Sequence, residues 1–149
     1  MSIRRLDHVG IIVDDLAAAT AFFVALGLEA DPPMIVEGEW VGRVNGLDDS
    51  HVELVTVHTP DNQGRLELTR FITPADDRGR DAAPSNRHGI RHVALVVDDI
   101  DAAVTTAREH GCDLVRDVVD YEGIYRLCYV RGPEGIIVEL AEETGRGEN

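Results

Sequence analysis

Two stretches of the sequence share one pattern: DHVGIIVDDLAAA at residues 7–19 and RHVALVVDDIDAA at residues 91–103. In both, a histidine precedes a run of aliphatic residues, and an Asp-Asp pair comes before an alanine-rich segment. Agreement over such a length is improbable by chance and indicates that one supersecondary unit occurs twice. The chain is therefore predicted to contain two related modules.

Each copy of the pattern predicts a strand followed by a helix. The aliphatic run is rich in β-branched residues, which favour extended backbone. Asp15 and Asp99 suit the helix N-cap, where a side-chain oxygen accepts from backbone N–H groups that have no partner within the helix. The residues that follow place apolar side chains at helical spacing. Gly27 and Gly111 then fit the left-handed position that ends a helix.

Further strand patterns, separated by turn residues, complete each half. They cover residues 34–38, 40–46, 51–58 and 65–72 in the first half, and 113–119, 124–131 and 135–141 in the second. The sequence therefore predicts an α+β fold made of two tandem βαβββ modules. The predicted organisation is a first module over 1–73, a linker over 74–88, a second module over 89–143 and a polar tail over 144–149.

Two histidines and two glutamates occupy equivalent places in the two halves. Side chains on a strand alternate between faces, so His8 and His92 should point away from the apolar rows that pack on the helices. Glu67 and Glu139 lie between apolar neighbours in the last strands, where an isolated carboxylate would be costly to bury. A metal ion removes that cost, and imidazole nitrogens with carboxylate oxygens suit a divalent transition metal such as Zn, Ni, Co, Mn or Fe. A lone strand His or Glu is more often structural or solvated, so the repetition carries this prediction.

Composition excludes several other classes of function. The formal net charge is −14, whereas a nucleic-acid partner requires a basic surface. The sequence has no lysine, which excludes Schiff-base chemistry through that residue. No apolar run is long enough to span a bilayer, and the first residues lack the apolar core of a signal peptide, so a cytoplasmic protein is expected. Cys112 and Cys128 lack the spacing of a zinc finger, and Cys128 is predicted to be a core residue.

Four segments carry a resemblance to a known family. They are LDHVGI at 6–11, RLEL at 65–68, GIRHVA at 89–94 and GIIVEL at 135–140. In these segments the chain resembles the vicinal oxygen chelate superfamily, which includes glyoxalase I, methylmalonyl-CoA epimerase, extradiol dioxygenases and the bleomycin and fosfomycin resistance proteins. The resemblance covers nearly the whole chain. It implies paired modules that form a U-shaped, partly closed mixed sheet around a metal, with the helices outside.

The resemblance also implies a ligand set and a reaction. His8, Glu67, His92 and Glu139 match the family's four metal-ligand positions, and this set looks most like that of glyoxalase I. The implied activity is that of a metal-dependent lyase or isomerase, in which a proton is removed next to a carbonyl and the metal stabilises the resulting enediolate. Glu67 or Glu139 would be the base. The alternatives are an epimerase or extradiol-type dioxygenase on the same scaffold, or a non-catalytic ligand-binding protein such as the bleomycin resistance members.

Other residues are candidates for the pocket of a small-molecule substrate: Trp40, Tyr121, Tyr125 and Arg126. Trp40 is equally suited to be a core aromatic residue. Exposed strand edges favour pairing with a second chain, and the family usually dimerises, so a homodimer is expected. The metal site would lie within one chain or be shared between two.

Overall fold

The computed structural model describes residues 1–79 and 82–145. The chain divides into two compact units, Met1–Gly79 and Arg80–Asn149. The boundary between them falls within the segment predicted to be a linker. Residues 80 and 81 of that segment and residues 146–149 of the predicted tail lie outside the described residues.

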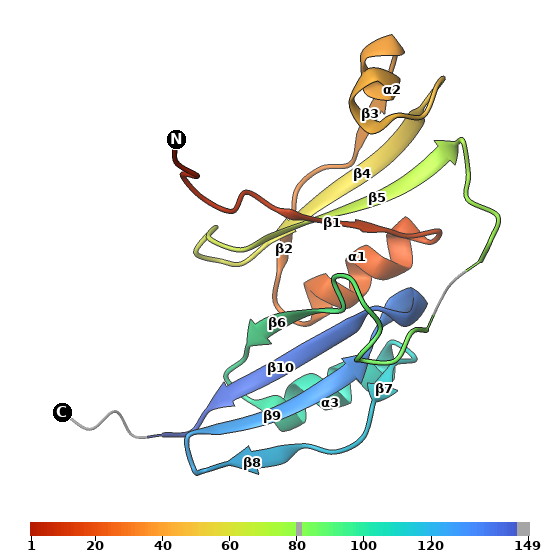
Figure 1. Ribbon diagram of the computed structural model, residues 1–149. Helices are drawn as coiled ribbons and strands as arrows, with labels where there is room; N and C mark the ends of the chain where they lie inside the picture. The colour runs from red at the N-terminus through yellow and green to blue at the C-terminus, as the bar shows by residue number, and fades with distance from the viewer. Residues whose placement is uncertain (80–81, 146–149) are drawn as a thin grey trace. The chain divides into compact units, whose positions relative to one another are not determined.

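The first unit is a mixed sheet with one long helix on it (Figure 1). Its strand order is β1-β5-β4-β2, and β3 also pairs with β4. The β1–β5 pair is parallel, and the other pairs are antiparallel. The elements are β1 (Val9–Ile12), α1 (Leu16–Ala25), β2 (Glu29–Ala30), β3 (Met34–Glu37), α2 (Glu39–Asn45), β4 (His51–His58) and β5 (Arg65–Thr73).

The second unit repeats this topology. Its strand order is β6-β10-β9-β7, and β8 also pairs with β9. Again the first and last strands, β6 and β10, are parallel neighbours, and the other pairs are antiparallel. The elements are β6 (His92–Val96), α3 (Ile100–Glu109), β7 (Asp113–Leu114), β8 (Val119–Tyr121), β9 (Tyr125–Arg131), a short 3₁₀ turn (Pro133–Gly135) and β10 (Ile137–Glu143). The predicted α+β fold of two repeated modules is thereby confirmed, with one five-stranded, unclosed mixed sheet in each unit.

The predicted ends of the two long helices are confirmed. The Asp15 side chain accepts a hydrogen bond from the backbone N–H of Ala18, and the Asp99 side chain accepts one from Ala102, each at 2.9 Å. These bonds satisfy N–H groups that have no partner within the helix. Gly27 and Gly111 follow the helices with φ of 113° and 76°, a conformation that a side chain disfavours.

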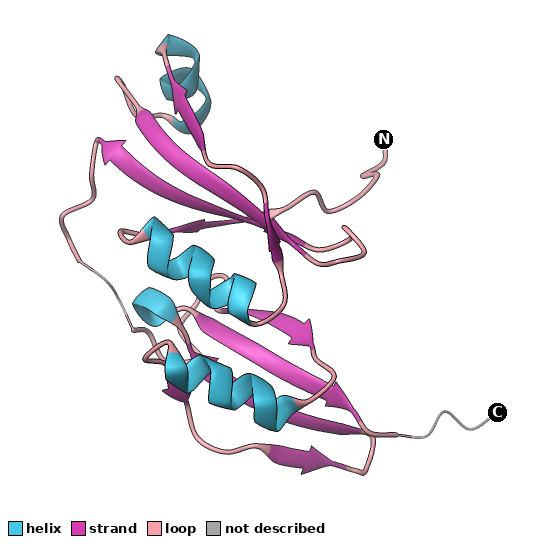
Figure 2. Ribbon diagram, turned by 180° about the vertical axis from the view of Figure 1, so that it is seen from behind, coloured by secondary structure: helices cyan, strands magenta, loops and turns pink. Residues whose placement is uncertain are grey.

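Each unit has its own core between the helix and one face of its sheet (Figure 2). In the first unit, Phe22 and Phe23 of α1 are fully buried, as are Val57 of β4 and Leu68 of β5, the two strands that α1 contacts. In the second unit, Ile100 of α3 is fully buried, as are three sheet residues, Val130, Val138 and Leu140. Cys128 belongs to this second core, as predicted, and burial raises the pKa of its thiol. Within the described part of each unit, the long helix covers only one face of its own sheet (Figure 2).

The strand predicted over 40–46 is wrong, because this segment forms the two-turn helix α2. Trp40, Gly42 and Val44 alternate with other residues in a way that imitates a strand. The backbone decides otherwise: Gly46 ends the helix with a left-handed φ of 81°. A Cβ on Gly42 would lie 2.7 Å from the carbonyl oxygen of Leu47, so the helix packs closely on the turn that follows it. Trp40 is consequently 59% exposed and is not a core residue.

The strand predicted over 113–119 is also wrong in part, because two short strands, β7 and β8, occupy its ends.

The segment before β6 is held to the rest of the second unit at one point. Ala83 is 2% exposed, and the Arg131 guanidinium donates hydrogen bonds to the carbonyl oxygens of Ala83 and Gly135 at 2.8 and 3.0 Å. Within the described residues, no helix has the length and apolar character needed to cross a membrane.

Candidate metal centre

In the first unit, the parallel pairing of β1 and β5 brings His8 to Glu67. Gly10 is the register partner of Glu67, and His8 precedes it by two residues, so both side chains project from the face opposite α1. The His8 Nε2 atom lies 3.4 Å from the Glu67 Oε2 atom. The buried neighbours Leu66 and Leu68 hold the strand on the helix, which leaves Glu67 on the open face.

The second unit builds the same pair at the same register. Ala94 is the partner of Glu139, as Gly10 is of Glu67, and His92 precedes Ala94 by two residues. The His92 Nε2 atom lies 3.3 Å from the Glu139 Oε2 atom. The side chains of His92 and Glu139 are 38% and 23% exposed, so solvent reaches this pair on the open face of the sheet.

The spacing within each pair fits two ligands of one metal ion. Ligand atoms about 2.0–2.2 Å from zinc that subtend about 90–110° at the ion lie about 2.8–3.6 Å apart. Both observed distances fall in this range. The described residues contain no cluster of three or more His, Cys, Asp or Glu side chains that could hold an ion. Within each unit the structure brings together one histidine and one glutamate of the four predicted ligands.

Asp7 interacts with the second ring nitrogen of His8. Its Oδ2 atom lies 2.9 Å from His8 Nδ1, and its Oδ1 atom accepts a hydrogen bond from Arg5 at 2.8 Å. The hydrogen bonds from His8 and Arg5 lower the pKa of the Asp7 carboxyl, which keeps it an ionised acceptor. A neutral imidazole that donates to this carboxylate would carry its proton on Nδ1 and its lone pair on Nε2. In that tautomer His8 Nε2 and Glu67 Oε2 would both be acceptors, and a cation between them would relieve their repulsion.

Tyr129 lies beside the second pair and was missed by sequence reasoning. It is the antiparallel partner of Glu139 on β9, and its ring centroid lies 5.0 Å from that of His92 at an interplanar angle of 38°. Its half-buried ring limits the orientations open to His92. The signal was present in the alternation of β9, because the buried neighbours Cys128 and Val130 assign Tyr129 to the open face.

The remaining pocket candidates are placed on different elements. Tyr125 is four residues before Tyr129 on β9 and pairs with Tyr121 on β8, so both lie on the sheet face that carries Glu139. Trp40 lies on α2 of the first unit and is exposed.

Arg126 faces the helix side of the second sheet. Its guanidinium donates to both carboxylate oxygens of Asp101 on α3 at 2.9 and 3.0 Å and lies 3.6 Å from Glu142. These contacts engage Arg126 on the face opposite Glu139, where it supports α3.

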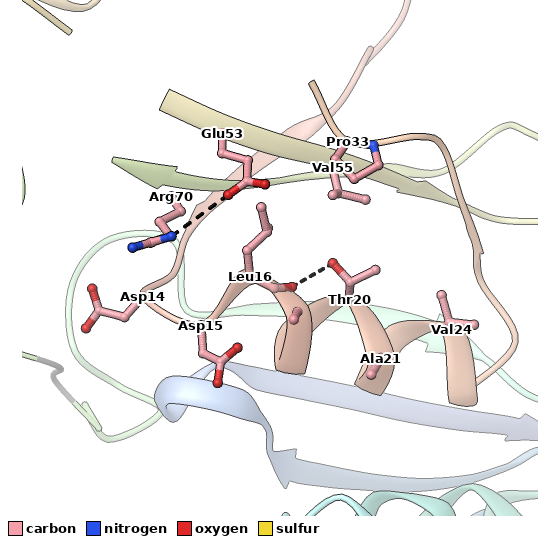
Figure 3. A pocket seen from close by; sticks show the side chains of 11 residues that line it. Asp14, Asp15, Leu16, Thr20, Ala21, Val24, Pro33, Glu53, Val55 and Arg70 are labelled. Carbon is pink, nitrogen blue, oxygen red and sulfur yellow. Dashed lines mark hydrogen bonds and ion pairs between the residues drawn. The ribbon is translucent and has the colours of Figure 1, made fainter. Parts of the chain in front are cut away.

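A pocket of about 670 Å³ in the first unit lies on the α1 side of the sheet (Figure 3). Apolar side chains of α1, among them Leu16 and Val24, form one wall, and the ion pair of Glu53 and Arg70 forms part of the other. Because this pocket occupies the helix-covered face, it is separate from the candidate ligands.

Comparison with known proteins agrees with this architecture. The family model described as the Glyoxalase/Bleomycin resistance protein/Dioxygenase superfamily matches residues 5–140. The chain belongs to this superfamily. This match confirms the family expected from the sequence, and the matched range includes all four candidate ligands. It does not distinguish between the activities found within the superfamily.

Individual relatives extend over nearly the whole chain. The uncharacterized protein YaeR of Escherichia coli is 28% identical, with 96% of this chain and 99% of YaeR covered. A solved glyoxalase family protein of Bacillus cereus is 46% identical, with 97% of each chain covered and a TM-score of 0.93. The fosfomycin resistance protein FosX of Listeria monocytogenes, solved with Mn(II) and a dihydroxypropylphosphonic acid, is 15% identical. That likeness covers 99% of this chain and 94% of FosX with a TM-score of 0.62, and it shows the shared fold.

Proposed function

We propose that this protein is a metal-dependent lyase or isomerase of the glyoxalase I type, which transfers a proton next to the carbonyl of a small-molecule substrate. The observation that supports the proposal is the repeated His–Glu pair. Two units place the same two residue types on the same strand register, with nitrogen–oxygen distances of 3.4 and 3.3 Å. A structural role for either pair alone would not require this repetition.

In this proposal, His8, Glu67, His92 and Glu139 bind one divalent ion, either within one chain or across a homodimer in the cytoplasm. The donor set suits Zn, Ni, Co, Mn or Fe, because imidazole and carboxylate groups serve all of them. When bound, the ion would act as a Lewis acid toward two neighbouring substrate oxygens.

The chain's own residues supply the proton acceptor. A carboxylate beside the substrate carbon can act as general base, and Glu139 and Glu67 are the two candidates. Tyr121 and Tyr125 share the sheet face of Glu139 and can contact the rest of a small substrate.

Elemental analysis of protein purified without added metal tests the ligand set. We expect about one ion per chain in the wild type, and loss of that ion in both His8→Ala and His92→Ala. His88→Ala is the matched control, because His88 is exposed and lies outside the pairs. If the wild type binds about two ions per chain and each His variant loses one of them, each pair binds its own ion and the four-ligand site is wrong.

Turnover of a methylglyoxal–thiol hemithioacetal by the metal-loaded protein tests the reaction. A rate that falls on chelation and returns with metal supports the glyoxalase type. Turnover of an acyl-thioester epimer or ring cleavage of a catechol would instead identify one of the enzyme alternatives. Tight ligand binding with no turnover of any of them would favour a binding protein.

Mixing the His8→Ala and His92→Ala variants tests whether the site is shared between two chains. If one site takes His8 from one chain and His92 from its partner, a mixed dimer of His8→Ala and His92→Ala contains one intact site. Metal content and activity then recover in the mixture. No recovery, with subunit exchange verified, places all four ligands in one chain.

A further inference from the structure

We propose that Asp7 is a positioning residue that prepares His8 for metal binding by fixing the tautomer and the orientation of its imidazole ring. This inference rests on the proposed metal site. It concerns a residue outside the four ligands and explains how one half of the site is ordered before metal arrives.

The contact geometry carries the argument. Asp7 Oδ2 lies 2.9 Å from His8 Nδ1, while Nε2 of the same ring lies 3.4 Å from Glu67 Oε2. An ionised carboxylate can only accept, so a neutral imidazole that bonds to it carries its proton on Nδ1 and keeps on Nε2 the lone pair that a metal requires. Carboxylates that accept from the second nitrogen of a metal-binding histidine fix its tautomer and orientation in this way.

Arg5 orients the carboxylate itself. It donates to Oδ1 at 2.8 Å, which leaves Oδ2 for His8, so each oxygen of Asp7 has one partner. The Arg5 side chain is 76% exposed, and an ion pair so open to solvent stabilises little. The main effect is therefore expected from Asp7 and a much smaller one from Arg5.

The second unit supplies the internal comparison. Arg91 precedes His92, and its side chain cannot accept a hydrogen bond. The hydrogen bond between Asp7 and His8 Nδ1 therefore has no counterpart from the residue before His92. Instead the Tyr129 ring lies against His92. A packed ring restricts orientation but does not select which nitrogen carries the proton. The two histidines should consequently differ in tautomer in the metal-free protein.

Long-range ¹⁵N–¹H NMR of the metal-free full chain tests the tautomer. We expect His8 to be protonated at Nδ1 in the wild type and chiefly at Nε2 in Asp7→Ala. Asp7→Glu should restore part of the wild-type signal. Asp76→Ala is the matched control, because Asp76 is an exposed carboxylate of the same unit that binds Arg78 but no histidine. An unchanged His8 tautomer in Asp7→Ala overturns the proposal.

Titration with Zn²⁺ or Co²⁺ tests the consequence for binding. Asp7→Ala should weaken metal affinity by about 10–100-fold, the usual effect of losing such a partner. Asp7→Asn should weaken metal affinity less, because its amide oxygen still accepts from Nδ1. Asp76→Ala should leave metal affinity unchanged. If Asp7→Ala keeps the wild-type metal affinity while His8→Ala binds metal more weakly, the role of Asp7 is rejected and the metal site is not. Wild-type affinity in His8→Ala as well rejects the proposed metal site itself.

Discussion

The two units place the same His–Glu pair on the same parallel register, yet they surround it with different residues. In the first unit, a carboxylate precedes the histidine, and Thr56 pairs across from Glu67. In the second unit, Arg91 precedes the histidine, and Tyr129 pairs across from Glu139. The backbone topology therefore accounts for the pair, and the neighbouring side chains account for the difference between the halves. If the protein catalyses the proposed reaction, we expect the two halves to contribute to it unequally.

The largest expected difference between the halves is in catalysis. An amide oxygen can still coordinate a metal but cannot accept the substrate proton, so Glu67→Gln and Glu139→Gln separate binding from base catalysis. We expect one of them to lower kcat by about 10²–10⁴-fold while retaining much of the metal. The measurement is kcat on an active substrate, with metal content determined in parallel. Full turnover in both variants would contradict the glyoxalase-type mechanism.

Stability should respond equally in the two halves. Leu68 and Leu140 follow the two glutamates directly, and both are fully buried against a helix. Replacement of either by Ala should lower the free energy of unfolding by about 2–5 kcal/mol, through lost burial and a cavity. Urea unfolding followed by circular dichroism gives the values. A difference of several kcal/mol between the variants would show that the repeated units do not share equivalent cores.

The residues across from the glutamates should differ in effect. Tyr129→Leu removes an aromatic contact with His92. It should lower the free energy of unfolding by about 0.5–1.5 kcal/mol beyond the effect of the lost buried area. It should also weaken metal binding. Thr56→Val changes the equivalent position of the first sheet, where Asp7 already orients the histidine, and should leave metal affinity near that of the wild type. Isothermal titration with Zn²⁺ on both variants measures this difference. An equal loss in both would remove the special role assigned to Tyr129.

The smallest expected effect concerns the helix N-caps. Asp15→Ala removes the side-chain acceptor at the start of α1 and should lower the free energy of unfolding by about 1 kcal/mol. Asp99→Ala should cost less, because Glu142 also accepts from the first turn of α3, at 2.8 Å from the Ile100 nitrogen. Thermal unfolding of both variants, with the double variant Asp99→Ala/Glu142→Gln, checks this order. A loss of stability in Asp99→Ala as large as that in Asp15→Ala, with no further loss in the double variant, would contradict this order.

The sequence predicted the repeat, the caps and the faces of the strands because these depend on local spacing. Alternation alone assigned Glu67 and Glu139 to the side away from the core, and the buried Leu68 and Leu140 agree with that assignment. The helix α2 was not predicted, because a short segment with alternating apolar residues fits either structure. The close approach of Gly42 to the carbonyl oxygen of Leu47 in the following turn is a contact that local spacing does not reveal.

The surroundings of the candidate ligands depend on pairing between strands and could not be predicted as well. Tyr129 and Arg126 lie on the same strand but point to opposite faces of the sheet. Tyr129 shares a face with Glu139, and Arg126 pairs with Asp101 on the other face. Only the antiparallel register of β9 and β10 separates their roles. Asp7 was adjacent to His8 in the sequence, but its contact with Nδ1 depends on the rotamers of both side chains.

The parallel pairing of β1 with β5, and of β6 with β10, also has a consequence for the order of folding. The hairpins β4–β5 and β9–β10 join neighbouring segments, whereas Val9 must find Leu66 and Val93 must find Val138 from the far ends of their units. Closing such loops costs chain entropy before any contact compensates, and contacts distant in sequence slow folding. We therefore expect the hairpins to form first and the first strands to dock afterwards. Each His–Glu pair lies at such a docking step, so an ion bound there would stabilise the contacts that the chain finds hardest to form.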